Sequence, residues 1–154
     1  MKNNKYKICF LDIDGVCNSI IWDRYKSECS YIDPDLDPKA IDLINKLCSE
    51  FNLAIVISSS WKLDSYCIPR LERAGLENII DTTPDLLWQK GIDYSRGEEI
   101  DAWLKDHSVE DYIILDDDTD FTEEQLSHFI HINPYYGFIE KDYETAKLML
   151  SCER

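Results

Sequence analysis

Two acidic clusters in this 154-residue sequence have the spacing of catalytic or metal-binding groups. The first is Asp12-Ile13-Asp14-Gly15, in which two carboxylates two positions apart are followed by a glycine. The second is Asp116-Asp117-Asp118. Three adjacent carboxylates repel one another unless a cation neutralises them. Such oxygen ligands suit Mg²⁺, which takes only a few protein carboxylates and keeps several waters. Each cluster is equally compatible with a solvated turn, because Asp and Gly are common turn residues.

A calcium-binding loop was the other possibility for the second cluster. Asp116, Asp118 and Asp120 have the alternating spacing of such a loop. Phe121, however, stands where the loop needs glycine, and Ser127 stands where it needs the closing glutamate. The sequence therefore does not predict a calcium loop.

Four further polar residues could bind a phosphate group. Ser58 and Ser59 follow an apolar run, and hydroxyl and backbone N–H groups can donate hydrogen bonds to phosphate oxygens. Arg96 lies at the start of a predicted helix, where a cation interacts unfavourably with the helix dipole. This cost suggests that Arg96 serves another purpose, such as binding phosphate. Lys62 is a separate cation that could converge on the same place. The ordinary alternatives are serines in a turn and exposed basic residues.

Alternating strand and helix patterns must position these residues. Apolar runs predict strands at residues 7–12, 53–58, 78–81 and 111–116, and a weaker strand at 129–132. Capping residues and apolar periodicity predict helices from Asp37-Pro38, from about 64 to 74, from Ser95 and from about 142. This alternation predicts a three-layer, doubly wound α/β fold with a mainly parallel sheet, in a single domain over residues 1–154. In such sheets ligands bind beyond the carboxyl ends of the strands, where Asp12, Ser58 and Asp116 lie.

Composition limits the classes of partner. With 16 Lys+Arg against 31 Asp+Glu, the net charge of −15 disfavours strong non-specific binding to nucleic acid. A hydrophobic fraction of 44% is too high for a disordered acidic tail. No apolar run approaches the roughly 18 residues of a membrane span, and we expect no signal peptide. The six cysteines lack CxxC and zinc spacing. We expect a soluble, cytoplasmic protein with reduced thiols and no membrane partner.

Taken together and in this order, the motifs resemble those of the haloacid dehalogenase (HAD) superfamily of phosphohydrolases, over nearly the whole chain. Asp12 and Asp14 match its DxDG[TV] motif, and Ser58 matches its strand-end Ser/Thr. Arg96 matches its Lys/Arg motif, and Asp116-Asp117 matches its terminal acidic motif. The resemblance implies a HAD-like Rossmannoid fold.

Three longer stretches narrow the resemblance. Val-Ile-Ser-Ser-Ser-Trp-Lys, Arg-Gly-Glu-Glu-Ile-Asp-Ala-Trp-Leu and Leu-Asp-Asp-Asp are similar to sequences of the HAD domains in Swiss Army Knife RNA repair proteins. Two features depart from that pattern. Lys62 stands where such domains often have Arg, and the chain is unusually acidic.

The resemblance implies phosphomonoester hydrolysis through an aspartyl-phosphate. Asp12 would be the nucleophile and Asp14 the general acid and base. Ser58 and Arg96 would hold the phosphoryl oxygens, with Ser59 and Lys62 as further substrate-binding residues. The expected Mg²⁺ ligands are Asp12, the backbone carbonyl of Asp14, and Asp117, with Asp116 as an alternative direct ligand or a supporting group.

Neither of the long gaps between motifs has the length for a cap domain, so no cap domain is expected. An open site favours a macromolecular phosphate, such as a polynucleotide end. Residues 19–31, with Trp22, Tyr25 and Tyr31, could form a small flap or stacking surface, or could cover the edge of the core.

Three other functions would account for parts of this sequence. A small-molecule phosphatase such as a nucleotidase would use residues 82–94 as a lid. A non-catalytic HAD-fold binding domain is disfavoured because all the motif residues are present. A receiver domain is excluded, because it would carry its acidic pair after the first strand and its phosphorylated Asp after the third.

Overall fold

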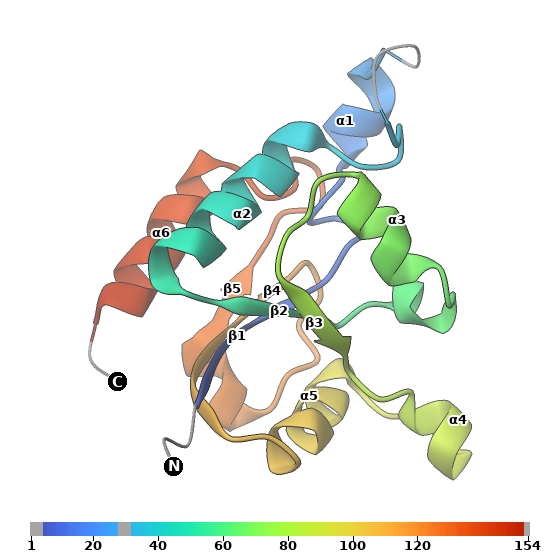
Figure 1. The fold of residues 1–154 in the computed structure, drawn as a ribbon, viewed down its shortest axis with the longest axis vertical. Helices are drawn as coiled ribbons and strands as arrows, with labels where there is room; N and C mark the ends of the chain where they lie inside the picture. The colour runs from blue at the N-terminus through green and yellow to red at the C-terminus, as the bar shows by residue number, and fades with distance from the viewer. Residues whose placement is uncertain (1–4, 28–31, 153–154) are drawn as a thin grey trace.

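Five parallel strands form a single sheet in the computed structural model, which describes residues 5–27 and 32–152 (Figure 1). The strands are β1 (Tyr6–Leu11), β2 (Ala54–Ile57), β3 (Ile79–Thr82), β4 (Val109–Asp116) and β5 (Phe129–His131). Their order in the sheet is β3-β2-β1-β4-β5, and every pairing is parallel. The chain moves outward from β1 to β3 and then crosses to the other side of β1. The switch point, where such sheets bind ligands, therefore lies between β1 and β4.

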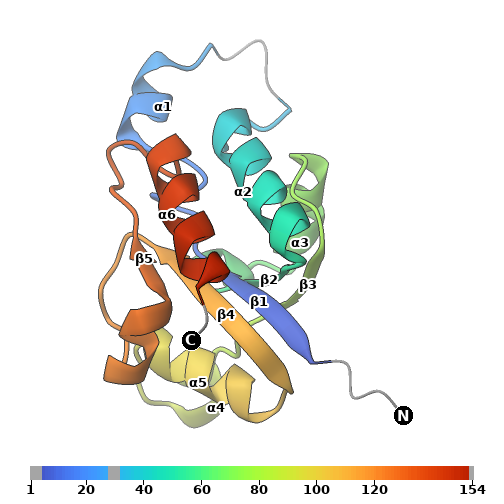
Figure 2. The same ribbon diagram turned by 90° about the vertical axis from the view of Figure 1, so that its left-hand side faces the viewer.

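Helices cover both faces of the sheet (Figures 1 and 2). One face carries α2 (Pro38–Phe51), α3 (Cys67–Arg73) and α6 (Glu140–Ser151), and the other carries α5 (Arg96–Lys105). The shorter elements are α1 (Ile20–Tyr25), α4 (Leu86–Lys90) and the 3₁₀ helices η1 (Ser60–Leu63) and η2 (Glu123–His128). The three-layer, doubly wound α/β prediction is confirmed.

The central strands contribute to two cores because successive side chains point to opposite faces. Cys9 and Leu11 of β1 pack into the larger core with buried residues of α2, α3 and α6. Ile8 and Phe10 pack into the smaller core, which includes Ile100 and Trp103 of α5. These four side chains of β1 are fully buried. Burial on both faces explains why β1 reads as a continuous apolar run.

The two long helices α2 and α5 begin where the sequence predicts, because capping residues fix their first turns. The side chain of Asp37 accepts a hydrogen bond from the Lys39 N–H to open α2, and that of Ser95 accepts from the Glu98 N–H to open α5. The helix predicted from about residue 64 begins only at Cys67, because the preceding residues form η1, which Ser59 caps. Residues 82–94, considered above as a lid, contain α4, which Asp85 caps.

The described residues contain no cap domain between Asp14 and β2, nor between Ser58 and Arg96, as predicted. None of the helices in the described ranges is long and apolar enough to cross a membrane. Five cysteines are free thiols: Cys9, Cys17, Cys48 and Cys67, which are buried, and Cys152, which is exposed. Cys29 lies outside the described residues.

Candidate active site

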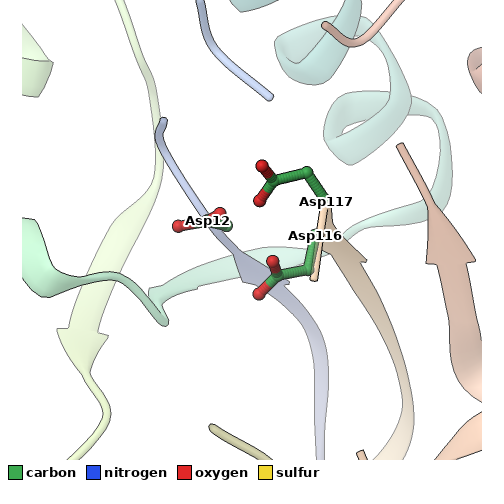
Figure 3. Close-up of side chains that lie close together, drawn as sticks. All are labelled: Asp12, Asp116 and Asp117. Atoms are coloured by element: carbon green, nitrogen blue, oxygen red, sulfur yellow. The ribbon is translucent and has the colours of Figure 1, made fainter. Parts of the chain in front are cut away.

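The tips of β1 and β4 bring three carboxylates together. Asp12 directly follows β1, and its N–H donates to the Leu115 carbonyl at 3.0 Å, which extends the pairing of β1 with β4. Asp12, Asp116 and Asp117 each offer an oxygen, and these oxygens lie within 4.8 Å of one another. Figure 3 shows the three carboxylates around a common space. Asp12 and Asp116 are buried, and Asp117 is half-buried. The arrangement is an acidic centre at the switch point of the sheet.

Gly15 lets the turn after β1 approach the loop after β4. Its φ of +84° lies in the left-handed region, which favours glycine. A Cβ at this position would come within 2.7 Å of the Asp117 Cγ, so any side chain would overlap that carboxylate. The glycine after Asp12 and Asp14 thus makes room for the Asp117 carboxylate.

Arg96 neutralises part of the acidic centre. Its Nη1 lies 2.8 Å from Asp12 Oδ1 and 2.8 Å from Asp116 Oδ2. The loop after β4 fixes the start of α5, because the Arg96 N–H donates to Asp120 Oδ2 at 3.0 Å and the Gly97 N–H donates to the Asp120 carbonyl at 3.2 Å. A cation at a helix N-terminus is unfavourable for the dipole, and the two carboxylates compensate for it.

The acidic centre has more negative charge than Arg96 can balance. Burial raises the pKa of Asp12 well above its usual range, and the neighbouring Asp116 raises it further, while Arg96 opposes both effects. Burial also raises the pKa of Asp116, again against Arg96. Burial alone would lower the pKa of Arg96, but the two carboxylates raise it above its ordinary value. A divalent cation would stabilise the ionised carboxylates.

Ser58 brings an unpartnered hydroxyl to the same edge. Its N–H donates to the Leu11 carbonyl at 2.8 Å, which places Ser58 beside the end of β1. The Ser58 side chain is buried, and its Oγ has no hydrogen-bond partner in residues 5–27 and 32–152. A buried hydroxyl without a partner is costly, and a phosphate oxygen could satisfy it. The hydroxyl of Ser59 accepts from the Trp61 N–H at 3.2 Å, which leaves its own proton to donate, and its predicted role in substrate binding stays a prediction.

Asp14 lies apart from the three clustered carboxylates. Its side chain is exposed at the turn after β1. Asn18 Nδ2 donates to Asp14 Oδ1 at 3.0 Å, and Trp61 Nε1 donates to Asp14 Oδ2 at 3.1 Å. The metal-facing role predicted for Asp14 concerns its backbone carbonyl and stays a prediction.

Lys62 does not contact the acidic centre. Its Nζ donates to Glu99 Oε1 at 2.8 Å, to Thr83 Oγ1 at 3.0 Å and to the Pro84 carbonyl at 3.2 Å. These three bonds use all three ammonium protons, and only 8% of the side chain is exposed. Lys62 therefore ties η1 to α5, and its predicted role in substrate binding stays a prediction.

A family model described as the HAD domain in Swiss Army Knife RNA repair proteins matches residues 8–143. This range includes the whole acidic centre, Ser58 and Arg96. The chain belongs to this family. Membership confirms the resemblance and assigns the chain to the HAD superfamily of phosphohydrolases. Its described residues form a domain without a cap. Searches of curated proteins and of solved structures gave no match.

The surface of this HAD domain is hollowed on the α5 side of the site. A hollow of about 290 Å³ is bordered by Ser59 and Arg96, and by Leu63, Leu87 and Tyr94 on the outer side. A larger cleft of about 850 Å³ lies between β3, α4 and α5, and its lining does not include the acidic centre. The lining of the smaller hollow includes neither Asp14 nor the three clustered carboxylates, so Arg96 is its link to the acidic centre.

The segment predicted as a flap begins with α1. Its Ser19 N-cap accepts from the Trp22 N–H at 3.0 Å, and Trp22 Nε1 donates to the Pro34 carbonyl at 2.9 Å. Tyr25 is 73% exposed, and Tyr31 lies outside the described residues. A flap or stacking role for residues 19–31 stays a prediction.

Some residues of the HAD site were not identified from the sequence alone. Asn18 and Trp61 bind Asp14, while Asp120 and Gln125 hold the start of α5. Trp61 stands within the Ser-rich motif that supported the family resemblance, but its contact with Asp14 joins residues 47 positions apart. Nothing in local spacing signals such a contact.

Proposed function

We propose that this HAD domain is a Mg²⁺-dependent phosphomonoesterase that works through an aspartyl-phosphate on Asp12. The observation that carries the proposal is the buried Asp12 carboxylate, which lies 2.8 Å from Arg96 in a cluster of three carboxylates. The unpartnered hydroxyl of Ser58 at the same edge supports a binding site for phosphoryl oxygens.

The donor set fits Mg²⁺, because it consists of hard carboxylate oxygens with excess negative charge. Asp12, Asp117 and the backbone carbonyl of Asp14 would hold the ion, with Asp116 as a further ligand or as the partner of Arg96. When bound, Mg²⁺ neutralises charge between the anionic nucleophile and the anionic phosphate.

The protein's own residues account for the two chemical steps. A carboxylate oxygen of Asp12 attacks phosphorus and forms an acyl phosphate, while the bond from phosphorus to the leaving oxygen breaks. Asp14 donates a proton to that oxygen. In the second step Asp14 takes a proton from the water that attacks phosphorus, which releases phosphate and restores Asp12. Arg96 and Ser58 donate to the phosphoryl oxygens during both steps.

Two classes of leaving group are candidates. A polynucleotide end is favoured by the family's description, which names RNA repair proteins, and by the lack of a cap domain over the site. A small phosphate ester is the second candidate, because residues of the segment 82–94, expected as a lid, border the hollow of about 290 Å³ beside Arg96.

The direct test measures phosphate release by the purified chain with and without Mg²⁺. Substrates are an aryl phosphate, oligonucleotides phosphorylated at the 5′ or 3′ end, mononucleotides and sugar phosphates. We expect hydrolysis that requires Mg²⁺ and is abolished by Asp12→Asn. Turnover that survives this substitution would remove Asp12 as nucleophile. A preference for mononucleotides would favour the second candidate, and no hydrolysis of any ester would favour a non-catalytic binding domain.

A further inference from the structure

Asp14 is held by two neutral N–H donors to which the HAD superfamily motifs matched in the sequence assign no role. Asn18 binds one carboxylate oxygen and Trp61 binds the other, at 3.0 and 3.1 Å. Asn18 is fixed in turn, because its Oδ1 accepts from the Gly15 N–H at 2.8 Å and its Nδ2 also donates to the Asp35 carbonyl at 3.1 Å. The exposed carboxylate of Asp14 is therefore tied to three segments of the chain.

Trp61 is itself held in place from two directions. Its backbone N–H donates to Ser59 Oγ, the cap of η1. The guanidinium of Arg70 lies over its ring, 4.3 Å from the ring centroid. Arg70 is anchored by Asp33 and Asp35, with Nε 2.6 Å from Asp33 Oδ2 and Nη2 2.8 Å from Asp35 Oδ2. The indole N–H thus has a defined position before any substrate binds.

The chemistry of the indole limits what Trp61 can do. An indole N–H donates a hydrogen bond but cannot accept a proton, so Trp61 cannot exchange protons with Asp14. The bond can instead fix the rotation of the carboxylate, a torsion that is broad for aspartate. Proton transfer is sensitive to such orientation, since misplacement by about 1 Å can cost about a hundredfold in rate.

We propose that Trp61 is a positioning residue that holds the Asp14 carboxylate in the orientation from which it transfers its proton. This inference rests on the proposed function, in which Asp14 protonates the leaving oxygen. The rate of hydrolysis of an ester whose leaving group needs no proton should therefore not depend on Trp61.

The test compares kcat/KM for two esters in Mg²⁺. One is an alkyl phosphate, whose leaving oxygen must be protonated, and the other is 2,4-dinitrophenyl phosphate, whose leaving group departs without a proton. Trp61→Phe keeps an aromatic ring under Arg70 and removes the N–H, together with part of the ring system. We expect about a tenfold loss on the alkyl ester and less than about a twofold change on the dinitrophenyl ester. Trp88→Phe, at a tryptophan that is 87% exposed on α4, is the control and should change neither value.

A double-mutant cycle separates positioning from a structural effect. In an Asp14→Asn background, Trp61→Phe should cause no further loss on the alkyl ester, because the group it positions is already inactive. An equal loss on both esters, or an undiminished loss in the Asp14→Asn background, would overturn the positioning role. Wild-type values for Trp61→Phe on both esters would overturn it as well.

Two measurements keep the inference testable if Trp61→Phe fails to fold or if the wild type is inert. Asn18→Ala removes the other donor to Asp14 and should show the same selective loss on the alkyl ester, and equal losses would contradict the inference. Without substrate or metal, Asp14→Ala should shift the indole fluorescence, and an unchanged spectrum would contradict the contact. A wild-type protein that hydrolyses neither ester would overturn the proposed phosphatase function, while the fluorescence comparison would still test the contact.

Discussion

At the scale of single residues, Gly15 controls where Asp117 can lie. Gly15→Ala would place a methyl group on the Asp117 carboxylate and push it out of the acidic centre. We expect the variant to need about tenfold more Mg²⁺ for half-maximal activity, because displacing a ligand weakens binding, and tenfold corresponds to about 1.4 kcal/mol. A magnesium titration of phosphate release measures the effect.

Gly91→Ala is the matched control for this substitution. Gly91 also has a left-handed φ, of +69°, and the described residues place no atom within 4 Å of the position a Cβ would occupy. Both variants therefore carry the backbone cost of about 1–2 kcal/mol, but only Gly15→Ala crowds a carboxylate. An equal change in magnesium dependence in both would contradict the role of Gly15.

The excess charge of the acidic centre predicts that Mg²⁺ stabilises the fold. At a magnesium concentration about 100 times the dissociation constant, the free energy of unfolding should rise by about 2.7 kcal/mol. For a chain of this size that corresponds to an increase in Tm of about 5–10 °C. Asp117→Asn removes one of the three clustered carboxylates and should reduce the increase, which thermal unfolding with and without Mg²⁺ measures. A full increase in Asp117→Asn would exclude Asp117 as a ligand.

At the scale of elements, the position of Arg96 depends on how α5 docks against the loop after β4. Gln125 is fully buried, and its Nε2 donates to the Gly97 carbonyl and to Asp101 Oδ1, both at 2.9 Å. Its Oε1 accepts from the Thr122 N–H at 3.1 Å. One side chain thus joins η2 to the first turn of α5.

Gln125→Ala should therefore raise KM and lower stability together. The substitution leaves buried backbone groups unpaired, at a cost of about 1–3 kcal/mol, and frees the helix start that carries Arg96. Steady-state kinetics and urea unfolding measure the two effects. Gln89→Ala, at an exposed glutamine of α4, is the control. An unchanged KM in a destabilised Gln125→Ala would show that Arg96 does not depend on this docking.

The positions of the main site residues could be predicted because they follow strands. The carboxyl ends of parallel strands share one edge of a sheet, so Asp12, Ser58 and Asp116 had to lie near one another once the strands were identified. Helix starts at Asp37 and Ser95 were predictable for a similar reason, since capping is local.

Contacts between distant short elements were not predictable in the same way. α1 and α4 have six and five residues, too few for apolar periodicity to reveal them, and they depend on their caps Ser19 and Asp85. A buried ammonium needs partners, and nothing in the sequence around Lys62 indicates that Glu99, 37 positions away, supplies one. Such pairings depend on the packed fold and leave no signal in spacing.

At the scale of the whole molecule, the net charge of −15 should oppose the approach of polyanions. If an oligonucleotide end is a substrate, kcat/KM should rise by about two- to tenfold as salt increases, because salt screens this repulsion. For an alkyl phosphate with no further charged group, kcat/KM should change less with salt, and this ester serves as the control. A kcat/KM for the oligonucleotide that falls with salt would instead indicate a local basic binding tract.

The chemical centre and its rim are built from different parts of the fold. Asp12 and Asp116 extend from the central strands β1 and β4, whereas α1 buries none of its residues and α4 buries only Leu86. Mutations on these outer segments cost little stability, since little packing is lost. Substitutions in α1 and α4 can therefore alter the surroundings of the site without disturbing the strands that carry Asp12 and Asp116.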